Sequence, residues 1–241
     1  IEQNRYIVLT DKNPQAYQPS KDEADSFPND PMFKDQYAHK VSNSMEGWKL
    51  TKGNPDVIVA IVDTGVDGTH PDLKAKLVPG FDVYNTDNPD SAYKDPQGHG
   101  THCAGIAGAI GNNKTGVIGF APDVKIQSVR VLGDDGSGTY EGVAQGIAWA
   151  AEHGAKVMSM SLGGPSSSEA IEEAIKLAIK NDVLPIAAMG NDGDDSLSYP
   201  AAIKGVMSVG ATDSKDKIAS FSQYGQHISV SAPGVNILST F

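Results

Sequence analysis

The sequence predicts an α/β fold of three layers, in which helices cover both faces of a mostly parallel β-sheet. Short apolar segments of strand length recur from residue 57 onward, and they are apolar at successive positions rather than at alternate ones, as strands buried on both faces are. Helical segments separate several of them, and this alternation is typical of parallel sheets. Glycine accounts for 26 of the 241 residues, which indicates many tight turns and close backbone contacts.

Six apolar segments are expected to form the strands of this sheet. Polar groups stand where three of them end: Asp63 ends the first, Ser161 lies near the end of the third, and Asn191 ends the fourth. Ligands and catalytic groups of open parallel sheets gather beyond the carboxyl ends of the strands, so these residues mark the expected edge of a composite site. The six segments are residues 57–63, 124–132, 156–164, 183–191, 206–212 and 228–234.

Three segments between the strands are expected to be helices. Residues 103–110 are rich in small side chains, as in a helix packed closely against a neighbour. Residues 139–153 carry two glycines four positions apart, on one helix face where a strand could approach. Residues 166–182 follow, and Ser166 with Glu169 fits a capping box at their start.

The composition indicates a globular protein and argues against two classes of partner. Hydrophobic residues make up 39% of the chain and charged residues 20%, and 241 residues can bury a sizeable core. The formal net charge of -11 repels phosphate backbones and anionic lipids, so we expect neither nucleic acid nor a membrane as a partner. The surplus carboxylates leave ligands for hard cations such as calcium.

The segment GHGTHCAG places His99, His102 and the chain's single cysteine, Cys103, within five residues. It could be a zinc site, a thiol nucleophile or a general base. Zinc is disfavoured because metalloproteases use His-Glu-x-x-His, whereas Gly and Thr stand between these histidines and no third ligand is near. A thiol nucleophile is disfavoured because neighbouring helical residues do not face each other, and the segment after Cys103 indicates a small buried side chain.

Asp63 favours the general-base interpretation. A carboxylate at the end of a buried strand is costly unless a donor meets it, and a histidine from the same edge would supply one. An aspartate that orients a histidine, whose other ring nitrogen takes a proton from a serine, is the logic of a catalytic triad. Two alternatives stay open: Asp63 could cap the following turn, and Asn191 lies in Gly-Asn-Asp-Gly, which suits a plain turn.

Five motifs occur in an order that resembles the subtilisin-like serine peptidases, especially their thermitase branch, whose members also carry a cysteine after the second histidine. The motifs are VAIVDTGVDGTHPDL, GHGTHCAGIAG, SMSLGG, AAMGNDG and SAPG. The resemblance implies a subtilisin-like fold and a serine endopeptidase. It also implies two regions: residues 1–28 as an N-terminal extension or the end of a propeptide, and residues 29–241 as a peptidase domain whose C-terminal part is missing.

The resemblance also implies roles for individual residues. Asp63 corresponds to the triad aspartate, His99 to the general base and Asn191 to the side chain that donates to the oxyanion, while His102 and Cys103 are supporting residues. Two segments correspond to those that hold an extended peptide substrate between them by β-augmentation. They are Gly136, Ser137 and Gly138, and Ser161, Leu162 and Gly163.

A structural calcium ion is implied by the same resemblance. The matching positions are Asp30, Asp72 and Asn113, and oxygen ligands from three distant segments would clip the N-terminal arm to the body of the protein. A solvated turn is the alternative at each position. The family resemblance also implies secretion.

One departure from the family pattern decides what is expected of this chain by itself. The family's nucleophile lies in Gly-Thr-Ser-Met-Ala, and no serine of residues 1–241 stands in that motif. We therefore expect these residues to be inactive alone and to need a C-terminal fragment as partner, with a propeptide as a second possible partner. A non-catalytic relative that binds calcium or peptides is the alternative.

Overall fold

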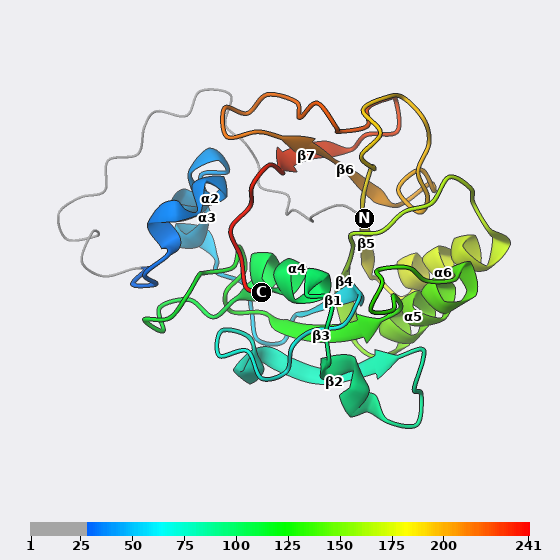
Figure 1. Ribbon diagram of the computed structural model, residues 1–241, viewed down its shortest axis with the longest axis horizontal. Coiled ribbons are helices and arrows are strands. Elements are labelled where there is room, and N and C mark those ends of the chain that lie inside the picture. Colours follow the sequence, from blue (N-terminus) through cyan, green and yellow to red (C-terminus); the bar gives the residue numbers. More distant parts are fainter. Residues whose placement is uncertain (1–27) are drawn as a thin grey trace.

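The computed structural model describes residues 28–241, which contain a seven-stranded parallel sheet with the strand order β2-β3-β1-β4-β5-β6-β7 (Figure 1). All six pairings between neighbouring strands are parallel, so the predicted three-layer α/β class is confirmed. The strands are β1 (Ile58–Asp63), β2 (Leu77–Asp82), β3 (Lys125–Arg130), β4 (Ala155–Met160), β5 (Leu184–Ala188), β6 (Met207–Thr212) and β7 (Val230–Pro233).

Helices cover both faces of the sheet. Helix α4 (His99–Gly108) lies on one face, and α5 (Tyr140–Glu152) and α6 (Glu169–Lys180) lie side by side on the other (Figure 1). Two short helices, α2 (Tyr37–Val41) and α3 (Ser44–Leu50), precede β1. Three 3₁₀ helices complete the helical elements of the described residues: η1 (Phe33–Asp35), η2 (Lys74–Lys76) and η3 (Pro89–Tyr93).

Strand β1 shows why the strands are apolar at successive positions. Ala60 and Val62 belong to the core that contains α5 and α6, whereas Val59 and Ile61 pack on the opposite face with Cys103 and its neighbours in α4. Successive side chains of a strand point to opposite faces, and in β1 both faces are buried among apolar side chains. The predicted burial of the strands on two sides is confirmed for β1.

Helix α5 shows how the small residues predicted to allow close packing are used. Thr139 caps its start by accepting a hydrogen bond from the Gly142 backbone N–H. A side chain at Gly146 would overlap Val131, directly after β3. The helix therefore lies closer to the sheet than a larger residue would permit.

The predicted capping box of the next helix is wrong by two residues. Helix α6 begins at Glu169 and its cap is Ser168, whose hydroxyl accepts from the Ile171 backbone N–H. Ser168 has the extended backbone that a cap requires. Three consecutive serines make the capping position ambiguous from sequence, and the neighbouring Ser167 bonds instead to Glu172.

The elements not expected from the sequence include β2, α2 and α3. Strand β2 contains Pro79 and Gly80, and its register with β3 shifts between Val78 and Phe81. Pro and Gly are tolerated there because β2 is an edge strand. Helices α2 and α3 are held by side-chain contacts with distant residues instead of by a strong local pattern.

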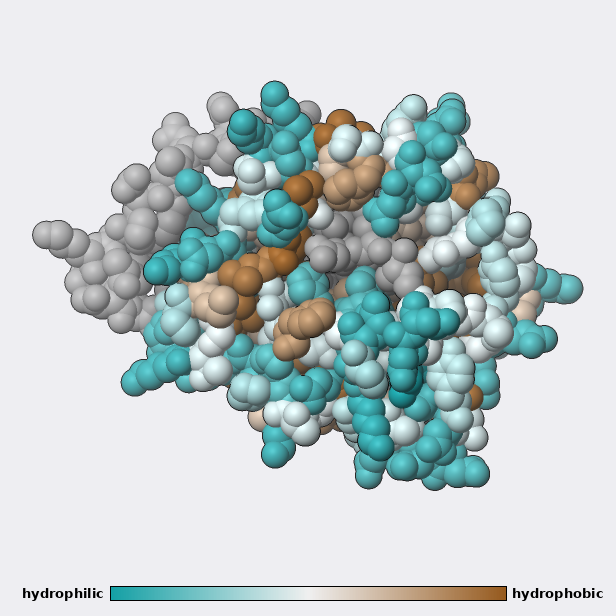
Figure 2. Space-filling model, in the orientation of Figure 1, coloured by the Kyte–Doolittle hydropathy of each residue, from teal (hydrophilic) through white to brown (hydrophobic). Residues whose placement is uncertain are grey.

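The surface agrees with the acidic composition. Figure 2 shows mostly hydrophilic residues on the face it presents, with hydrophobic residues gathered in a band across its middle. Among the described residues, every helix is too short or too polar to cross a bilayer. The N-terminal extension expected for residues 1–28 lies, except for its last residue, outside the described residues.

Candidate active site

Strand β1 places the buried carboxylate of Asp63 at the carboxyl edge of the sheet. Asp63 is the last residue of β1 and is fully buried. The strand lies between β3 and β4, with β2 and β3 on one side and β4 to β7 on the other. The chain therefore reverses its direction of winding at β1, and such switch points are where ligands bind in open α/β sheets.

Helix α4 places His99 at the same edge of the sheet. His99 is the first residue of this helix. The next residue, Gly100, lies so close to the loop after β1 that a side chain there would overlap the carbonyl oxygen of Gly65. The start of the helix is therefore pressed against the end of β1.

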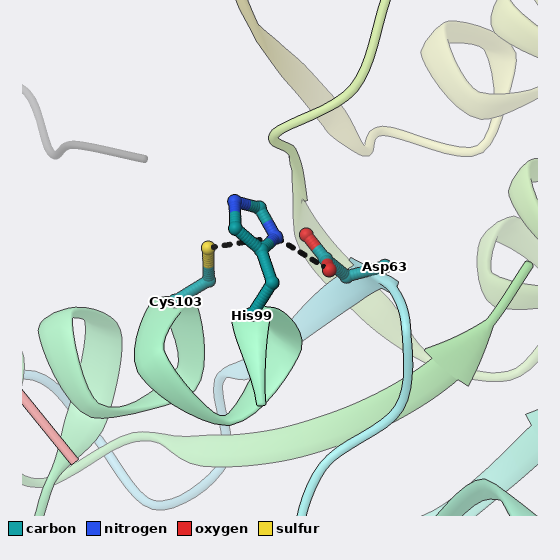
Figure 3. Close-up of side chains that lie close together, drawn as sticks. All are labelled: Asp63, His99 and Cys103. Carbon is teal, nitrogen blue, oxygen red and sulfur yellow. Dashed lines mark hydrogen bonds and ion pairs between the residues drawn. The ribbon is translucent and has the colours of Figure 1, made fainter. Parts of the chain in front are cut away.

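Asp63 and His99 are joined by a hydrogen bond of 2.7 Å between Oδ1 and Nδ1 (Figure 3). The same carboxylate oxygen accepts from the Thr64 backbone N–H, also at 2.7 Å. With Asp63 ionised, Nδ1 carries the shared proton, and in the neutral ring the second nitrogen, Nε2, is the basic one. Figure 3 shows that Nε2 lies on the side of the ring away from Asp63.

Two opposing effects act on the pKa of His99. Burial disfavours the protonated ring, but the hydrogen bond and charge of Asp63, together with Cys103, outweigh burial and raise the pKa above its ordinary value of 6.5. A buried carboxylate stabilises an imidazolium in this way because little water competes with it. The pair can therefore accept and hold a proton.

Cys103 lies one helical turn after His99 and is fully buried. Its Sγ atom is 3.9 Å from His99 Nδ1 (Figure 3). The same atom is 3.4 Å from Ser161 Oγ. Residues four apart share a helix face, so the spacing of His99 and Cys103 accounts for this contact. The thiol is packed in the core around α4, which agrees with a small buried side chain.

The two histidines of the motif do not meet. His102 Nε2 is 2.9 Å from the carbonyl oxygen of Ile237, in contact with the C-terminal segment. Among the described residues, one group of three or more His, Cys, Asp or Glu side chains has its ligand atoms within 4.8 Å, and it contains Asp63, His99 and Cys103 without His102. Within residues 28–241, His99 and His102 therefore do not share one group of candidate ligand atoms.

A cavity of about 620 Å³ lies beside the ends of β4 and β5. Asn191, Leu162 and Gly163, three of the residues singled out from the sequence, line it together. Ser161 is buried directly before Leu162 and contacts Cys103, so one short segment connects the cavity with the His99 side of the site. The lining also includes Gly164, Pro165, Ala188, Gly190, Asp192, Ser196, Leu197, Ser198, Tyr199 and Gln223.

Most of that lining was not expected from the sequence. Gln223 is almost completely buried, and its amide donates to the Ser196 carbonyl and hydroxyl oxygens. The antiparallel bridge between Gly164 and Tyr199 joins the two walls of the cavity. These residues come from loops distant in sequence, and no local pattern marks them.

The segment Gly136–Gly138 lies in the connection between β3 and α5. The Gly133 backbone N–H donates to the Ser137 carbonyl oxygen at 2.8 Å and closes this loop. Ser137 and Gly138 are exposed and do not line the cavity. Tyr140, two residues after the segment, lies close to Gly164, the residue that follows Gly163, so the chain next to each of the two expected segments meets at this point.

The three residues expected to bind calcium converge on one loop. The Asp30 carboxylate accepts from the Asn112 and Asn113 backbone N–H groups at 2.8 and 3.3 Å. Asp72 accepts from the Asn113 side-chain amide at 2.6 Å and from the Val117 backbone N–H at 3.1 Å. Both carboxylates are buried. Within residues 28–241, neither forms an ion pair with a basic side chain.

Comparison with known proteins agrees with this architecture. The model of the subtilase family matches residues 54–241. Thermitase from Thermoactinomyces vulgaris is 45% identical over 215 residues, which cover 89% of this chain and 76% of that protein. A thermophilic serine proteinase from Bacillus sp. strain AK1 is 42% identical over 214 residues, which cover 88% of this chain and 53% of the proteinase.

A solved structure gives the same result. A protease from Pseudoalteromonas arctica PAMC 21717 superposes with a TM-score of 0.77 at 33% identity, over 86% of this chain and 72% of that one. The chain thus spans between about half and three quarters of the length of the proteins it matches.

Proposed function

Because the chain belongs to the subtilase family, we propose that it forms the Asp- and His-bearing part of a serine endopeptidase. The observation that carries the proposal is the 2.7 Å hydrogen bond between Asp63 and His99 at the switch point of the sheet. The relatives in the comparison include a serine proteinase, and a carboxylate that orients a histidine is the arrangement that activates a serine hydroxyl.

In this proposal each residue has one chemical task. Asp63 holds the His99 ring and stabilises its charged form. His99 Nε2 takes the proton from a serine hydroxyl while the serine oxygen attacks the peptide carbonyl carbon, and it then gives that proton to the leaving amine. Water hydrolyses the resulting acyl-enzyme by the same route. The Asn191 side-chain amide donates a hydrogen bond to the oxyanion formed at the attacked carbonyl.

The proposal takes the serine from a segment outside residues 1–241, because none of their serines stands in the family's Gly-Thr-Ser-Met-Ala motif. Residues 1–241 by themselves then bind peptides without hydrolysing them. The segment that carries the serine is the first proposed partner, and a propeptide is the second. The residues upstream of 29 are proposed to be an extension or the end of that propeptide, and residues 29–241 part of the peptidase domain.

Substrate recognition is proposed for the two segments and the cavity. An extended polypeptide would pair its backbone with Gly136–Gly138 on one side and Ser161–Gly163 on the other, as an added strand. The cavity beside Leu162 is large enough to receive one substrate side chain, and we propose a preference for large apolar groups. The acidic net charge argues against nucleic acid as a substrate.

We propose a structural calcium ion at Asp30, Asp72 and Asn113. The residues fit such an ion, because two buried carboxylates share one loop and meet no basic side chain among the described residues. Hard oxygen ligands of this kind suit calcium. The ion would stabilise the connection between the N-terminal segment and the loop before β3. Secretion is proposed with it, since extracellular fluids supply calcium.

The proposal is tested by labelling the intact protein with a fluorophosphonate, which reacts covalently with an activated serine. We expect labelling of the wild type and its loss in His99→Ala. Asp213→Asn is the matched control, because this aspartate binds two backbone N–H groups in the turn after β6. Absence of labelling in the folded wild type would favour the alternative, a non-catalytic relative that binds calcium or peptides.

A further inference from the structure

Asp95 lies four residues before His99, in the loop that leads into α4, and both of its carboxylate oxygens are used. Oδ1 accepts from the Thr64 hydroxyl at 2.8 Å and from the Gly98 backbone N–H at 3.0 Å. Oδ2 accepts from the Thr101 backbone N–H at 2.8 Å and from the Thr101 hydroxyl at 2.5 Å. One half-buried carboxylate thus holds four donors from two elements.

These donors belong to the two elements that carry the proposed catalytic pair. Thr64 follows Asp63 directly at the end of β1, and Gly98 and Thr101 flank His99 at the start of α4. Two further bonds join the same elements. The Thr64 hydroxyl accepts from the Gly100 backbone N–H at 2.9 Å, and the Thr101 hydroxyl accepts from the Asp67 backbone N–H at 2.9 Å.

The first turn of a helix has backbone N–H groups without partners inside the helix, and a negative charge there is stabilising. Asp95 supplies that charge to the 10-residue helix α4. The helix's own cap residue, Gly98, has no side chain to do so. The carboxylate therefore stabilises the start of α4 and also attaches it to the exit of β1.

We propose that Asp95 is a positioning residue of the active site, which sets the distance between Asp63 and His99 by fastening the first turn of α4 to Thr64. The inference rests on the proposed function. Asp63 and His99 are 36 residues apart in the chain, so their geometry depends on how β1 and α4 are held together. Asp95 acts through the neighbours of both residues and touches neither side chain.

Asp95→Asn is the sharpest variant, because it keeps the shape and removes one acceptor. In either orientation the new amide group faces a backbone N–H, either that of Gly98 or that of Thr101. A donor facing a donor pushes the first turn of α4 away from Thr64. The hydrogen bond between Asp63 and His99 then lengthens or loses its alignment.

The expected kinetic signature in the intact enzyme is a change in turnover without a change in substrate binding. We expect kcat to fall by between about 10- and 100-fold, as for a displacement of a catalytic group by a fraction of an ångström to 1 Å. KM should stay within about twofold, because the substrate segments do not contact Asp95. The acid limb of the pH profile of kcat should move to lower pH, because a weaker contact with Asp63 supports the His99 proton less.

The acid limb of the pH profile of kcat is interpreted through the titratable groups that contact His99. Within residues 28–241, Asp63 from β1 and Cys103 from α4 are titratable side chains that contact the His99 ring. Asp95 itself is hydrogen-bonded to Thr64, Gly98 and Thr101. A shift of the acid limb in Asp95→Asn therefore reports on the pairing of His99.

Thr101 supplies a second pair of variants in case Asp95→Asn folds poorly. Thr101→Val removes the hydroxyl that joins Asp95 to Asp67, and we expect it to lower kcat in the same direction as Asp95→Asn. Thr101→Ser keeps the hydroxyl and should restore turnover to near the wild-type level. Asp213→Asn controls for the loss of a loop carboxylate and should leave kcat, KM and the pH profile unchanged.

A spectroscopic readout separates this inference from the proposed function. The proton between His99 Nδ1 and Asp63 gives a low-field ¹H NMR resonance that needs no substrate and no catalysis. We expect Asp95→Asn to shift or broaden it and Asp213→Asn to leave it unchanged. If wild-type protein shows the resonance but takes no fluorophosphonate label, the proposed function fails while this test still stands. An unchanged resonance and unchanged kcat in Asp95→Asn would overturn the inference, as would a lower melting temperature with unchanged kcat and pH profile.

Discussion

At the scale of single residues, a rise in pH has opposite effects through His99. Loss of its proton favours activity and lowers the stability of the fold. Burial alone would lower the pKa of His99, but the hydrogen bond and charge of Asp63, together with Cys103, outweigh burial and raise the pKa in the folded protein above 6.5. The protonated ring therefore stabilises the fold, and this contribution is complete below pH 6.5 and is lost as the pH rises through the folded pKa. The neutral ring is the form that can act as a base.

We expect the acid limb of kcat in the intact enzyme to lie above pH 6.5, with activity rising as the pH rises. Asp63→Asn should move that limb to lower pH and reduce kcat by a factor on the order of 10⁴, because an amide favours the wrong tautomer of the histidine. A pH profile of kcat for both proteins measures this. An acid limb below pH 6.5 in the wild type would show that Asp63 does not support the His99 proton.

Residue-level inference from sequence succeeds where a strong local constraint exists. Asp63 could be singled out because a carboxylate ends a buried strand, and His99 because it stands in a motif between glycines. The contact between Cys103 and His99 was missed although their spacing of four predicts it. Asp95 was missed because one more aspartate in an acidic loop carries no signal until its four hydrogen-bond donors are known.

At the scale of elements, two groups of contacts stand out among those that attach the segment from Asp30 to α3 to the rest of the described residues. The first is the proposed calcium site, which links Asp30 to Asn113 and Asp72. The second is an aromatic cluster in which His39 of α2 packs against Trp48 and Phe120. His39 is buried and hydrogen-bonded to Ser44 and to the Ile118 carbonyl oxygen. The residues of the first group were expected from the family resemblance, whereas the aromatic cluster was not, because its partners lie far apart in the chain and no local pattern marks them.

We expect calcium to stabilise the protein and a chelator to lower its melting temperature. An ion that binds only the folded state contributes about 2.7 kcal/mol at 100 times its dissociation constant. Asp72→Asn should remove most of this response, whereas Asp213→Asn should keep it. Thermal unfolding with calcium and with chelator measures the difference. An unchanged midpoint would show that Asp30, Asp72 and Asn113 are ordinary loop residues.

Burial of His39 predicts a second effect on stability. Burial lowers its pKa from 6.5 to about 4 despite the hydrogen bond to Ile118, so the unfolded chain binds the proton more readily than the folded one. The free energy of unfolding should therefore fall as the pH drops from about 6.5 toward 4. His39→Gln should flatten this dependence, as measured by denaturant titrations at several pH values. A slope that survives in His39→Gln would assign it to other groups.

At the scale of the whole molecule, the pattern of apolar runs was sufficient to predict the α/β class, and six of the seven strands match predicted segments. The remaining strand, β2, was not predicted, because Pro79 and Gly80 interrupt its apolar pattern. An edge strand tolerates both residues. The cavity was not predicted for a different reason. Its walls join loops after β4 and β5 with Gln223, and such convergence follows from the order of strands in the sheet.

Residues 1–241 by themselves should bind peptides weakly and hydrolyse them at a negligible rate. Loss of the triad serine costs a factor on the order of 10⁶ in turnover in a subtilisin, and we apply that magnitude to this protein. The measurement is hydrolysis of a fluorogenic peptide by residues 1–241 and by the intact protein, with an intact mass of each. Comparable rates for the two would place the nucleophile within residues 1–241.

We propose His99, paired with Asp63, as the base of a serine peptidase. The most direct test compares kcat/KM of His99→Ala and Cys103→Ala with that of the wild-type intact protein. We expect His99→Ala to lose nearly all activity and Cys103→Ala to retain most of it, because the buried thiol lies beside the ring and takes no part in proton transfer. A protein that keeps its activity without His99, or loses it without Cys103, would contradict the account.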